Sequence, residues 1–148
     1  MEFRKFSREL RSLTLKRGSV FKMTMFRQDG IVPKGENSTS RDKYFVIIGT
    51  TNDSVLIGTV IINTEINTRL YNRIVEYQHL LKATDYDYLD GKDRYVNCYE
   101  LFEFSYDRIL DKAEYIGLIE EPDMDYIIHK LQSSPAIKKG VLRRYLSV

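Results

Sequence analysis

The sequence of 148 residues has few of the residues that cross-link a fold or bind transition metals: one cysteine, two histidines, three prolines and no tryptophan. A single cysteine, Cys98, excludes an intrachain disulfide and any zinc site with two or more cysteine ligands. His79 and His129 lie far apart in the sequence, and there is no HExxH or CxxC motif. We therefore expect no metal and no cofactor, although carboxylates alone can bind a hard cation.

Long hydrophobic segments are missing as well. No apolar run reaches the length of about 18 residues that a membrane-spanning helix needs. The N-terminus also lacks the apolar middle segment of a signal peptide. We therefore expect a cytoplasmic protein without a membrane partner.

Charge is distributed unevenly, although the net charge is only +2. Residues 1–17 carry six basic and two acidic side chains, and residues 138–148 carry four basic and no acidic ones, so each end has a charge of +4. The rest of the chain is therefore acidic, mostly within residues 82–125. Basic ends can contact nucleic-acid phosphates or can simply be solvated, and both interpretations stay open.

Short segments with the periodicity of strands dominate the middle of the chain. The expected strands are 20–26, 44–48, 55–62, 74–81, 94–100, 101–104 and 115–119. In the first of these, Phe21, Met23 and Met25 share one face. Gly58 interrupts the third and predicts a bulge or a sharp bend, which is common where a small barrel closes.

Helical signals lie near the ends of the chain. Residues 1–16 have apolar side chains at helical spacing, Ser105 is a candidate N-cap for a short helix through Leu110, and Pro122 suits the first turn of a helix through Leu131. Residues 135–148 form a basic, amphipathic tail. The sequence predicts a mainly β, single-domain protein over 1–148, built as a small barrel with helical additions.

Five short motifs occur in the order seen in the MazF/PemK (Kid) family of toxins. They are Arg17-Gly18-Ser19-Val20-Phe21, Lys43-Tyr44-Phe45-Val46-Ile47-Ile48, Val60-Ile61-Ile62-Asn63-Thr64, the segment 93–102, and Ile116-Gly117-Leu118-Ile119-Glu120 with the helix after it. The resemblance covers residues 17–134 and leaves the N-terminal helix and the basic tail outside. The chain departs from the family where Ser19 replaces an acid, Lys43 an arginine and Tyr44 a proline.

The resemblance implies a homodimeric SH3-like barrel from a toxin–antitoxin system, with an antitoxin protein as partner. Family members cut single-stranded RNA without a metal: the ribose 2′-hydroxyl attacks its own phosphate and leaves a cyclic phosphate. The family's arginine and threonine fall on Lys43 and Thr64, and Arg41 stands close enough in sequence to reach the same site. These three residues are the catalytic candidates. The substrate-binding candidates are Asn63, Asn67 and Lys34, although both asparagines also fit turns.

Several other aromatic or ionisable residues could also have a function. Four tyrosines could stack on unpaired bases or could complete a half-buried barrel face: Tyr71, Tyr77, Tyr86 and Tyr88. We interpret His79 as a structural histidine, His129 as exposed and Cys98 as a small core residue. The aspartates at 85, 87, 90 and 93 could hold a cation but better fit a solvated turn.

Two other functions remain open. The first is a non-enzymatic interaction module on the same barrel, like the protein-targeting toxins of the CcdB type, with target contacts through the C-terminal segment. The missing family arginine favours this interpretation. The second is a nucleic-acid-binding protein that uses its two basic ends, for which affinity would fall steeply with salt.

Overall fold

The computed structural model describes residues 9–31, 40–65 and 75–146. The strands in these ranges are β1 (Ser19–Phe26), β2 (Ser40–Thr50), β3 (Leu56–Asn63), β4 (Gln78–Leu81), β5 (Arg94–Asn97), β6 (Phe102–Ser105) and β7 (Glu114–Leu118). The α-helices with assigned bounds are α3 (Tyr106–Lys112), α4 (Glu121–Ser133) and α5 (Lys139–Leu146). Short 3-10 turns occur at η1 (Arg27–Asp29), η3 (Val75–Tyr77) and η4 (Asp87–Leu89).

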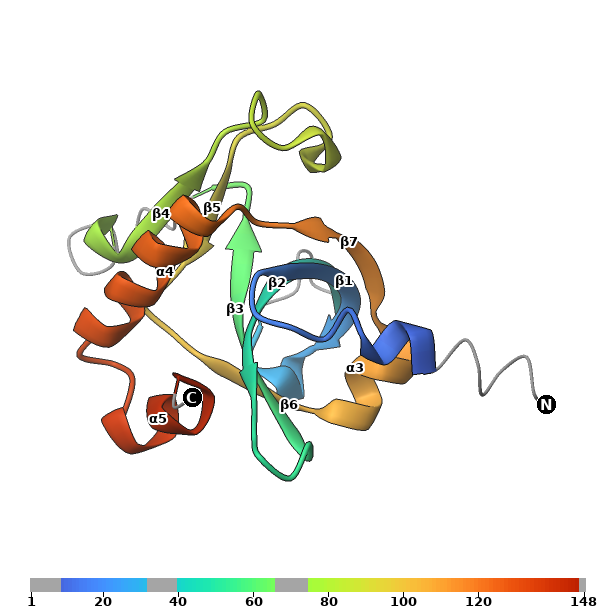
Figure 1. The fold of residues 1–148 in the computed structure, drawn as a ribbon. Helices are drawn as coiled ribbons and strands as arrows, with labels where there is room; N and C mark the ends of the chain where they lie inside the picture. Colours follow the sequence, from blue (N-terminus) through green and yellow to red (C-terminus); the bar gives the residue numbers. More distant parts are fainter. Residues whose placement is uncertain (1–8, 32–39, 66–74, 147–148) are drawn as a thin grey trace.

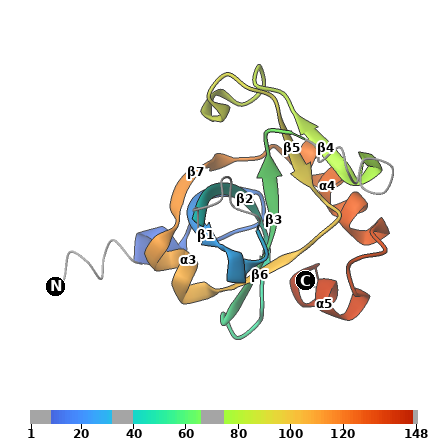
Figure 2. The same cartoon turned by 180° about the vertical axis from the view of Figure 1, so that it is seen from behind.

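The strands form one antiparallel sheet in the order β4-β5-β3-β2-β1-β7. Strand β3 is shared: its first half pairs with β6 and its last residues pair with β5. The sheet curls on itself, and α3 closes the gap between β6 and β7 (Figures 1 and 2). The prediction of a mainly β fold, a small barrel with helices, is confirmed.

The two faces of the curled sheet bury separate cores. The inner core contains Phe21, Met25, Phe45 and Ile47 and lies inside the barrel. The outer core lies between the sheet and helices α4 and α5, because its buried residues come from the strands and from these two helices. Strand β2 contributes to both cores because successive side chains point to opposite faces, which explains its unbroken apolar run.

Local signals placed several elements correctly. Phe21, Met23 and Met25 are buried on one face of β1, as expected. The Ser105 side chain accepts a hydrogen bond from the backbone N of Arg108 at 3.2 Å, so the N-cap prediction is confirmed. Pro122 lies in the first turn of α4, also as predicted. The pairing register of β2 and β3 shifts between Ile47 and Gly49, directly beside Gly58, which confirms the predicted bulge.

Some boundaries differ from the predictions. The expected strand 74–81 is the turn η3 followed by the short strand β4, and β2 extends at both ends beyond the expected 44–48. Of the expected N-terminal helix, residues 9–12 are helical, and residues 1–8 lie outside the described ranges. None of the described helices is long and apolar enough to span a bilayer.

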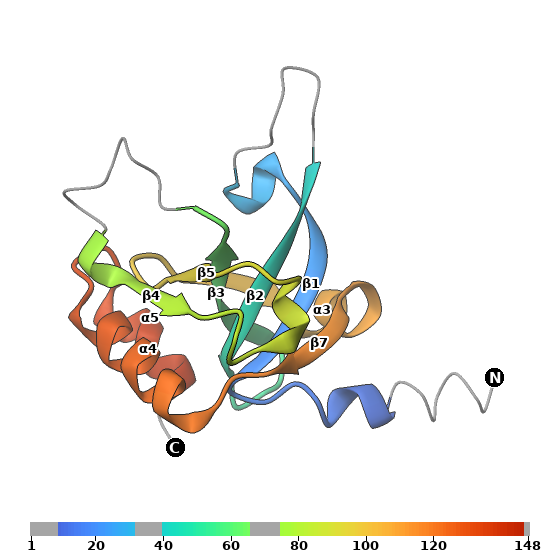
Figure 3. The same ribbon diagram turned by 90° about the horizontal axis from the view of Figure 1, so that it is seen from above.

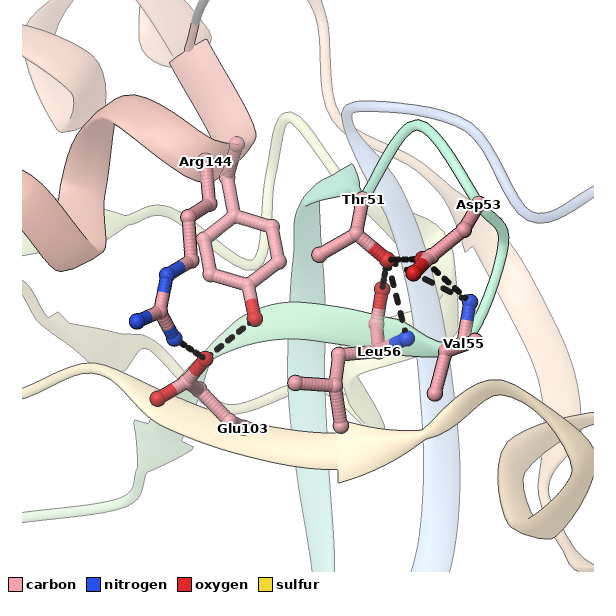
Figure 4. A network of polar contacts seen from close by, with 7 residues as sticks. Thr51, Asp53, Val55, Leu56, Glu103 and Arg144 are labelled. Carbon is pink, nitrogen blue, oxygen red and sulfur yellow. Dashed lines mark hydrogen bonds and ion pairs between the residues drawn. The ribbon is translucent and has the colours of Figure 1, made fainter.

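The segment expected as a basic tail forms the helix α5, which packs on the barrel. Leu142 and Tyr145 are buried in the outer core, and Tyr145 packs against Gly49 of β2 and Gly58 of β3. The Arg17 guanidinium links this helix to β2, donating from Nε to the Ile48 carbonyl at 2.7 Å and from a terminal nitrogen to the Tyr145 carbonyl at 2.8 Å. Glu103 on β6 accepts from the Tyr145 hydroxyl and lies 3.4 Å from Arg144 (Figure 4). Residues 139–146 are therefore part of the folded unit.

The β2–β3 hairpin that lies beside α5 is closed by side-chain contacts of its own. The Thr51 hydroxyl contacts Asp53 at 2.6 Å, and the Asp53 carboxylate accepts from the backbone N of Val55 at 3.1 Å (Figure 4). Side chains that bond their own turn in this way stabilise tight connections. Asn52 and Asp53 form the turn of this hairpin.

Candidate functional site

Two of the predicted site residues, Lys43 and Asn63, contact each other. Tyr44 pairs with Ile62 across β2 and β3, so Lys43 and Asn63 lie one position further along the same pair of strands. The Lys43 ammonium donates a hydrogen bond to the Asn63 side-chain oxygen. The fold thus joins residues that are 20 positions apart in the sequence.

Lys43 lies on the inner face of the sheet, at one end of the barrel core. It shares this face with Phe45 because side chains alternate along β2. Its exposed fraction is only 8%. A buried ammonium is costly unless it has polar partners, and Asn63 supplies one of them. In such a weakly screened position, the attraction between Lys43 and an approaching anion is stronger than in bulk water.

The other two catalytic candidates lie at the same end of β2 and β3. Arg41 is half-buried and shares the face of Lys43, two residues away, or roughly 7 Å along the strand. Thr64 follows Asn63 directly and is exposed, as is Glu65 after it. We call Arg41, Lys43, Asn63 and Thr64 the mouth site, at the end of the barrel where β2 begins and β3 ends (Figure 3). The remaining candidates, Lys34 and Asn67, lie outside the described residues.

The inner face around the mouth site carries positive charge. The inward residues of the adjoining strand segments are Met23, Met25, Arg41, Lys43, Phe45, Ile61, Asn63, Tyr95, Asn97, Gln78 and Leu80, and none of them is acidic. The neighbouring carboxylate Asp42 belongs to the opposite face, where it accepts from the Thr24 hydroxyl at 2.6 Å. The arrangement suits an anionic ligand such as a phosphodiester.

The tyrosines proposed for base stacking have structural contacts where they are described. Tyr86 is buried, its hydroxyl donates to Asp123, and burial raises its pKa. Tyr88 packs over Gly117, its hydroxyl donates to the Leu118 carbonyl at 3.0 Å, and burial raises its pKa too. Tyr77 pairs with Tyr99 at a ring distance of 5.3 Å. These contacts favour the second interpretation, that of a completed barrel surface, and Tyr71 lies outside the described residues.

Both histidines and the cysteine occupy the places expected of them. His79 Nε2 lies 2.7 Å from an oxygen of Asp123, and its ring stacks on Tyr126 at 5.6 Å, so it joins β4 to α4. His129 is exposed. Cys98 is fully buried, and burial raises the pKa of its thiol to about 12, so the reactive thiolate is negligible at neutral pH. Within the described ranges, no three His, Cys, Asp or Glu side chains converge as a metal site would require.

One residue of the inner face was missed by sequence reasoning. Tyr95 on β5 pairs with Asn63 on β3 and shares the face of the mouth site. Its neighbour Val96 is buried in the outer core, so the alternation along β5 fixes which side Tyr95 takes. The alternation was visible in the sequence, but the pairing of β5 with β3 was not.

A second surface feature lies between helices α4 and α5. It is an open groove of about 390 Å³ lined by Gln132, Lys139, Leu142, Arg143 and Leu146. Two of these residues are basic, and the apolar ones belong to α5. This groove is remote from the mouth site because α5 contacts the opposite ends of β2 and β3.

Comparisons with known proteins give no assignment. No family model matches the chain, and no curated protein matches it. The fold defines a class, a small β-barrel with helical additions.

Proposed function

We propose that this protein is a MazF/PemK-like toxin that binds single-stranded RNA at the mouth site and cleaves it without a metal. The observation that carries the proposal is the contact between Lys43 and Asn63, because the sequence alone had already indicated both residues as site candidates. The absence of acidic side chains on the adjoining inward positions of the described strands supports it further. A cytoplasmic location, a homodimer and an antitoxin partner belong to the same proposal.

The reaction requires charge stabilisation and two proton transfers. The ribose 2′-oxygen attacks the adjacent phosphorus, the bond from phosphorus to the 5′-oxygen breaks, and a 2′,3′-cyclic phosphate and a 5′-hydroxyl result. The attacking hydroxyl loses its proton to an acceptor, and the leaving oxygen gains one from a donor. Lys43 and Arg41 stabilise the negative charge that develops on the phosphorane oxygens.

The mouth site and the neighbouring residue Glu65 can fill these roles together. An ammonium has three donor hydrogens, so Lys43 can donate to Asn63 and to a phosphate oxygen together. Asn63 would thereby orient Lys43, and the Thr64 hydroxyl would contact the phosphate or the 2′-hydroxyl. The exposed carboxylate of Glu65 is the candidate proton acceptor, and Lys43 is the candidate donor to the leaving oxygen.

The test is cleavage of a fluorescent single-stranded RNA by the purified protein in the presence of EDTA. We expect a cyclic-phosphate product and no cleavage of an all-deoxy oligonucleotide, which lacks the attacking hydroxyl. The Lys43→Met variant keeps the apolar stem and should cleave about 100-fold more slowly or worse, the usual cost of losing one charge-stabilising donor. Lys22→Met is the matched control, because Lys22 pairs with Tyr44 on the opposite face of the sheet.

Two results would refute this proposal. One is wild-type protein that leaves the RNA intact in EDTA. The other is cleavage that survives Lys43→Met at the wild-type rate, which would place the reaction elsewhere in the protein.

The groove between α4 and α5 favours a second candidate function, an interaction module that inhibits a protein target. Deleting the C-terminal segment would not test it cleanly, because Leu142 and Tyr145 are buried. The double variant Lys139→Glu, Arg143→Glu changes the groove with less effect on the core. If this variant stops growth arrest on induced expression while Lys43→Met does not, the interaction module is the better description.

A further inference from the structure

The mouth site continues sideways across the sheet as a row of four residues. Lys43 on β2 contacts Asn63 on β3, Asn63 pairs with Tyr95 on β5, and Tyr95 pairs with Leu80 on β4. Directly paired residues of antiparallel strands project from the same face. The row therefore crosses four neighbouring strands, and three inter-strand steps span roughly 14 Å from Lys43 to Leu80.

The row faces away from the helices that cover the other side of the sheet. Leu81, Val96 and Ile62 alternate with the row residues and are buried in the outer core with α4. Leu80 itself is 39% exposed, and Tyr95 is half-buried. The two sides of the β4–β5 pair thus differ: one packs against α4, and the other carries a tyrosine and a leucine that remain partly accessible.

A second row, next to the first, adds amide groups. Gln78 and Asn97 are paired across β4 and β5, and Gln78 Nε2 donates to Asn97 Oδ1 at 2.9 Å. The same oxygen accepts from the backbone N of Tyr99 at 3.1 Å, which fixes the orientation of the Asn97 amide. Because the oxygen is used within the protein, the NH₂ group is what Asn97 can offer to a ligand.

We propose that this face of β5 and β4 binds the bases of the RNA whose phosphodiester occupies the mouth site, an inference that rests on the proposed function. Tyr95 stacks on one base, Leu80 extends the apolar surface beside it, and Asn97 donates to a base edge. Single-stranded RNA fits this surface because its bases are unpaired and can be splayed onto a sheet with an aromatic side chain. The cations at the mouth end neutralise its backbone, and the inward positions of these strands carry no opposing carboxylate.

Binding of a 2′-O-methyl oligouridine tests this proposal without cleavage, since the probe has no free 2′-hydroxyl. Tyr95→Ala should weaken binding about 5- to 150-fold, the loss expected for one base–aromatic stack. Tyr95→Phe should bind like the wild type because the ring is retained. An abasic oligonucleotide of equal length should bind Tyr95→Ala and the wild type equally well.

Tyr126→Ala is the matched control, because Tyr126 is a 61% exposed tyrosine on α4, on the other side of the sheet. It should leave binding unchanged, and thermal unfolding of each variant verifies folding. If the wild type cleaves RNA and Lys43→Met does not, but Tyr95→Ala binds the oligouridine as tightly as the wild type, base binding by this face is excluded and the proposed function stands. If the wild type neither binds nor cleaves RNA, both proposals fail.

Discussion

Asp29 and Arg108 form a bidentate ion pair near the barrel mouth. The two terminal guanidinium nitrogens of Arg108 each lie 2.7 Å from an Asp29 oxygen, and the backbone N of Phe26 donates to the same carboxylate at 2.7 Å. The pair joins the turn after β1 to α3, and the Asp29 side chain is only 8% exposed. Bidentate ion pairs between an arginine and a carboxylate are stronger than ordinary surface ion pairs because two parallel hydrogen bonds fix the geometry.

This pair makes stability depend on pH. The hydrogen bond from Arg108 holds the pKa of Asp29 below its ordinary value of 3.8. A depressed folded-state pKa adds stability that is present above the unfolded pKa and is lost as pH falls through the folded value. We expect Asp29→Asn to lower the free energy of unfolding by about 1–2 kcal/mol at pH 7, and by much less near pH 3.

Urea denaturation of the wild type and of Asp29→Asn at pH 7, 5, 4 and 3 measures how the difference in their free energies of unfolding shrinks with falling pH. Asp85→Asn, at an exposed position in a turn, is the control and should follow the wild type at every pH. A stability difference for Asp29→Asn that stays constant down to pH 3 would show that the ion pair is not its cause.

At the scale of elements, the packing of helix α5 on the sheet depends on two glycines. Gly49 on β2 and Gly58 on β3 lie under Tyr145, and a Cβ on Gly58 would come within 2.7 Å of the Tyr145 ring. A Cβ on Gly49 would collide with the Tyr145 carbonyl oxygen. Backbone from α5 can approach the sheet this closely because both positions lack a side chain.

Alanine at either glycine should therefore loosen α5. We expect Gly49→Ala and Gly58→Ala to destabilise the protein by about 1–3 kcal/mol through overpacking. Hydrogen exchange should become faster in residues 139–146. Gly140→Ala is the control: it lies in α5 with nothing within 4 Å of its Cβ and should stabilise the helix by about 0.5–1 kcal/mol. If hydrogen exchange in α5 is unchanged in both Gly49→Ala and Gly58→Ala, the packing of α5 does not depend on these glycines.

Elements whose signals are local were predictable, and those set by distant contacts were not. Alternation identified β1, and the Ser105 cap identified α3, because both signals lie within a few residues. The sequence showed that residues 135–148 are amphipathic, but not that they would pack on β2 and β3. That packing depends on Gly49 and Gly58, about 90 residues away in sequence. The sequence predicted only a bulge or a sharp bend at Gly58, not a contact with α5.

At the scale of the whole molecule, the candidate site likewise combines residues that the sequence indicated with one that only the strand pairing brings there. The resemblance to a toxin family selected Lys43, and the strand that ends at Asn63 was predicted from its apolar run. The inclusion of Tyr95 requires the pairing of β5 with the last residues of β3 while β6 takes the first half. That exchange of partners along one strand leaves no periodic signal in the sequence.

The fold separates two positively charged regions. Lys43 lies near the start of β2, whereas α5 contacts Gly49, six residues further on and roughly 20 Å away along the strand. Lys139 and Arg143 of α5 are exposed there. The mouth site and the basic end of the chain are thus separate surfaces, and an RNA that uses one need not touch the other.

The salt dependence of RNA binding distinguishes these surfaces. Each cation that contacts a single-strand phosphate contributes about 0.7 to the slope of log affinity against log salt, because it releases a counterion. If RNA lies across the mouth site, Lys43→Met should lower the slope of oligouridine binding by about 0.7. The double variant Lys139→Ala, Arg143→Ala should then leave the slope unchanged. The reverse pattern, an unchanged slope for Lys43→Met and a reduced slope for the α5 variant, would assign RNA binding to the basic end and remove the mouth site from the proposal.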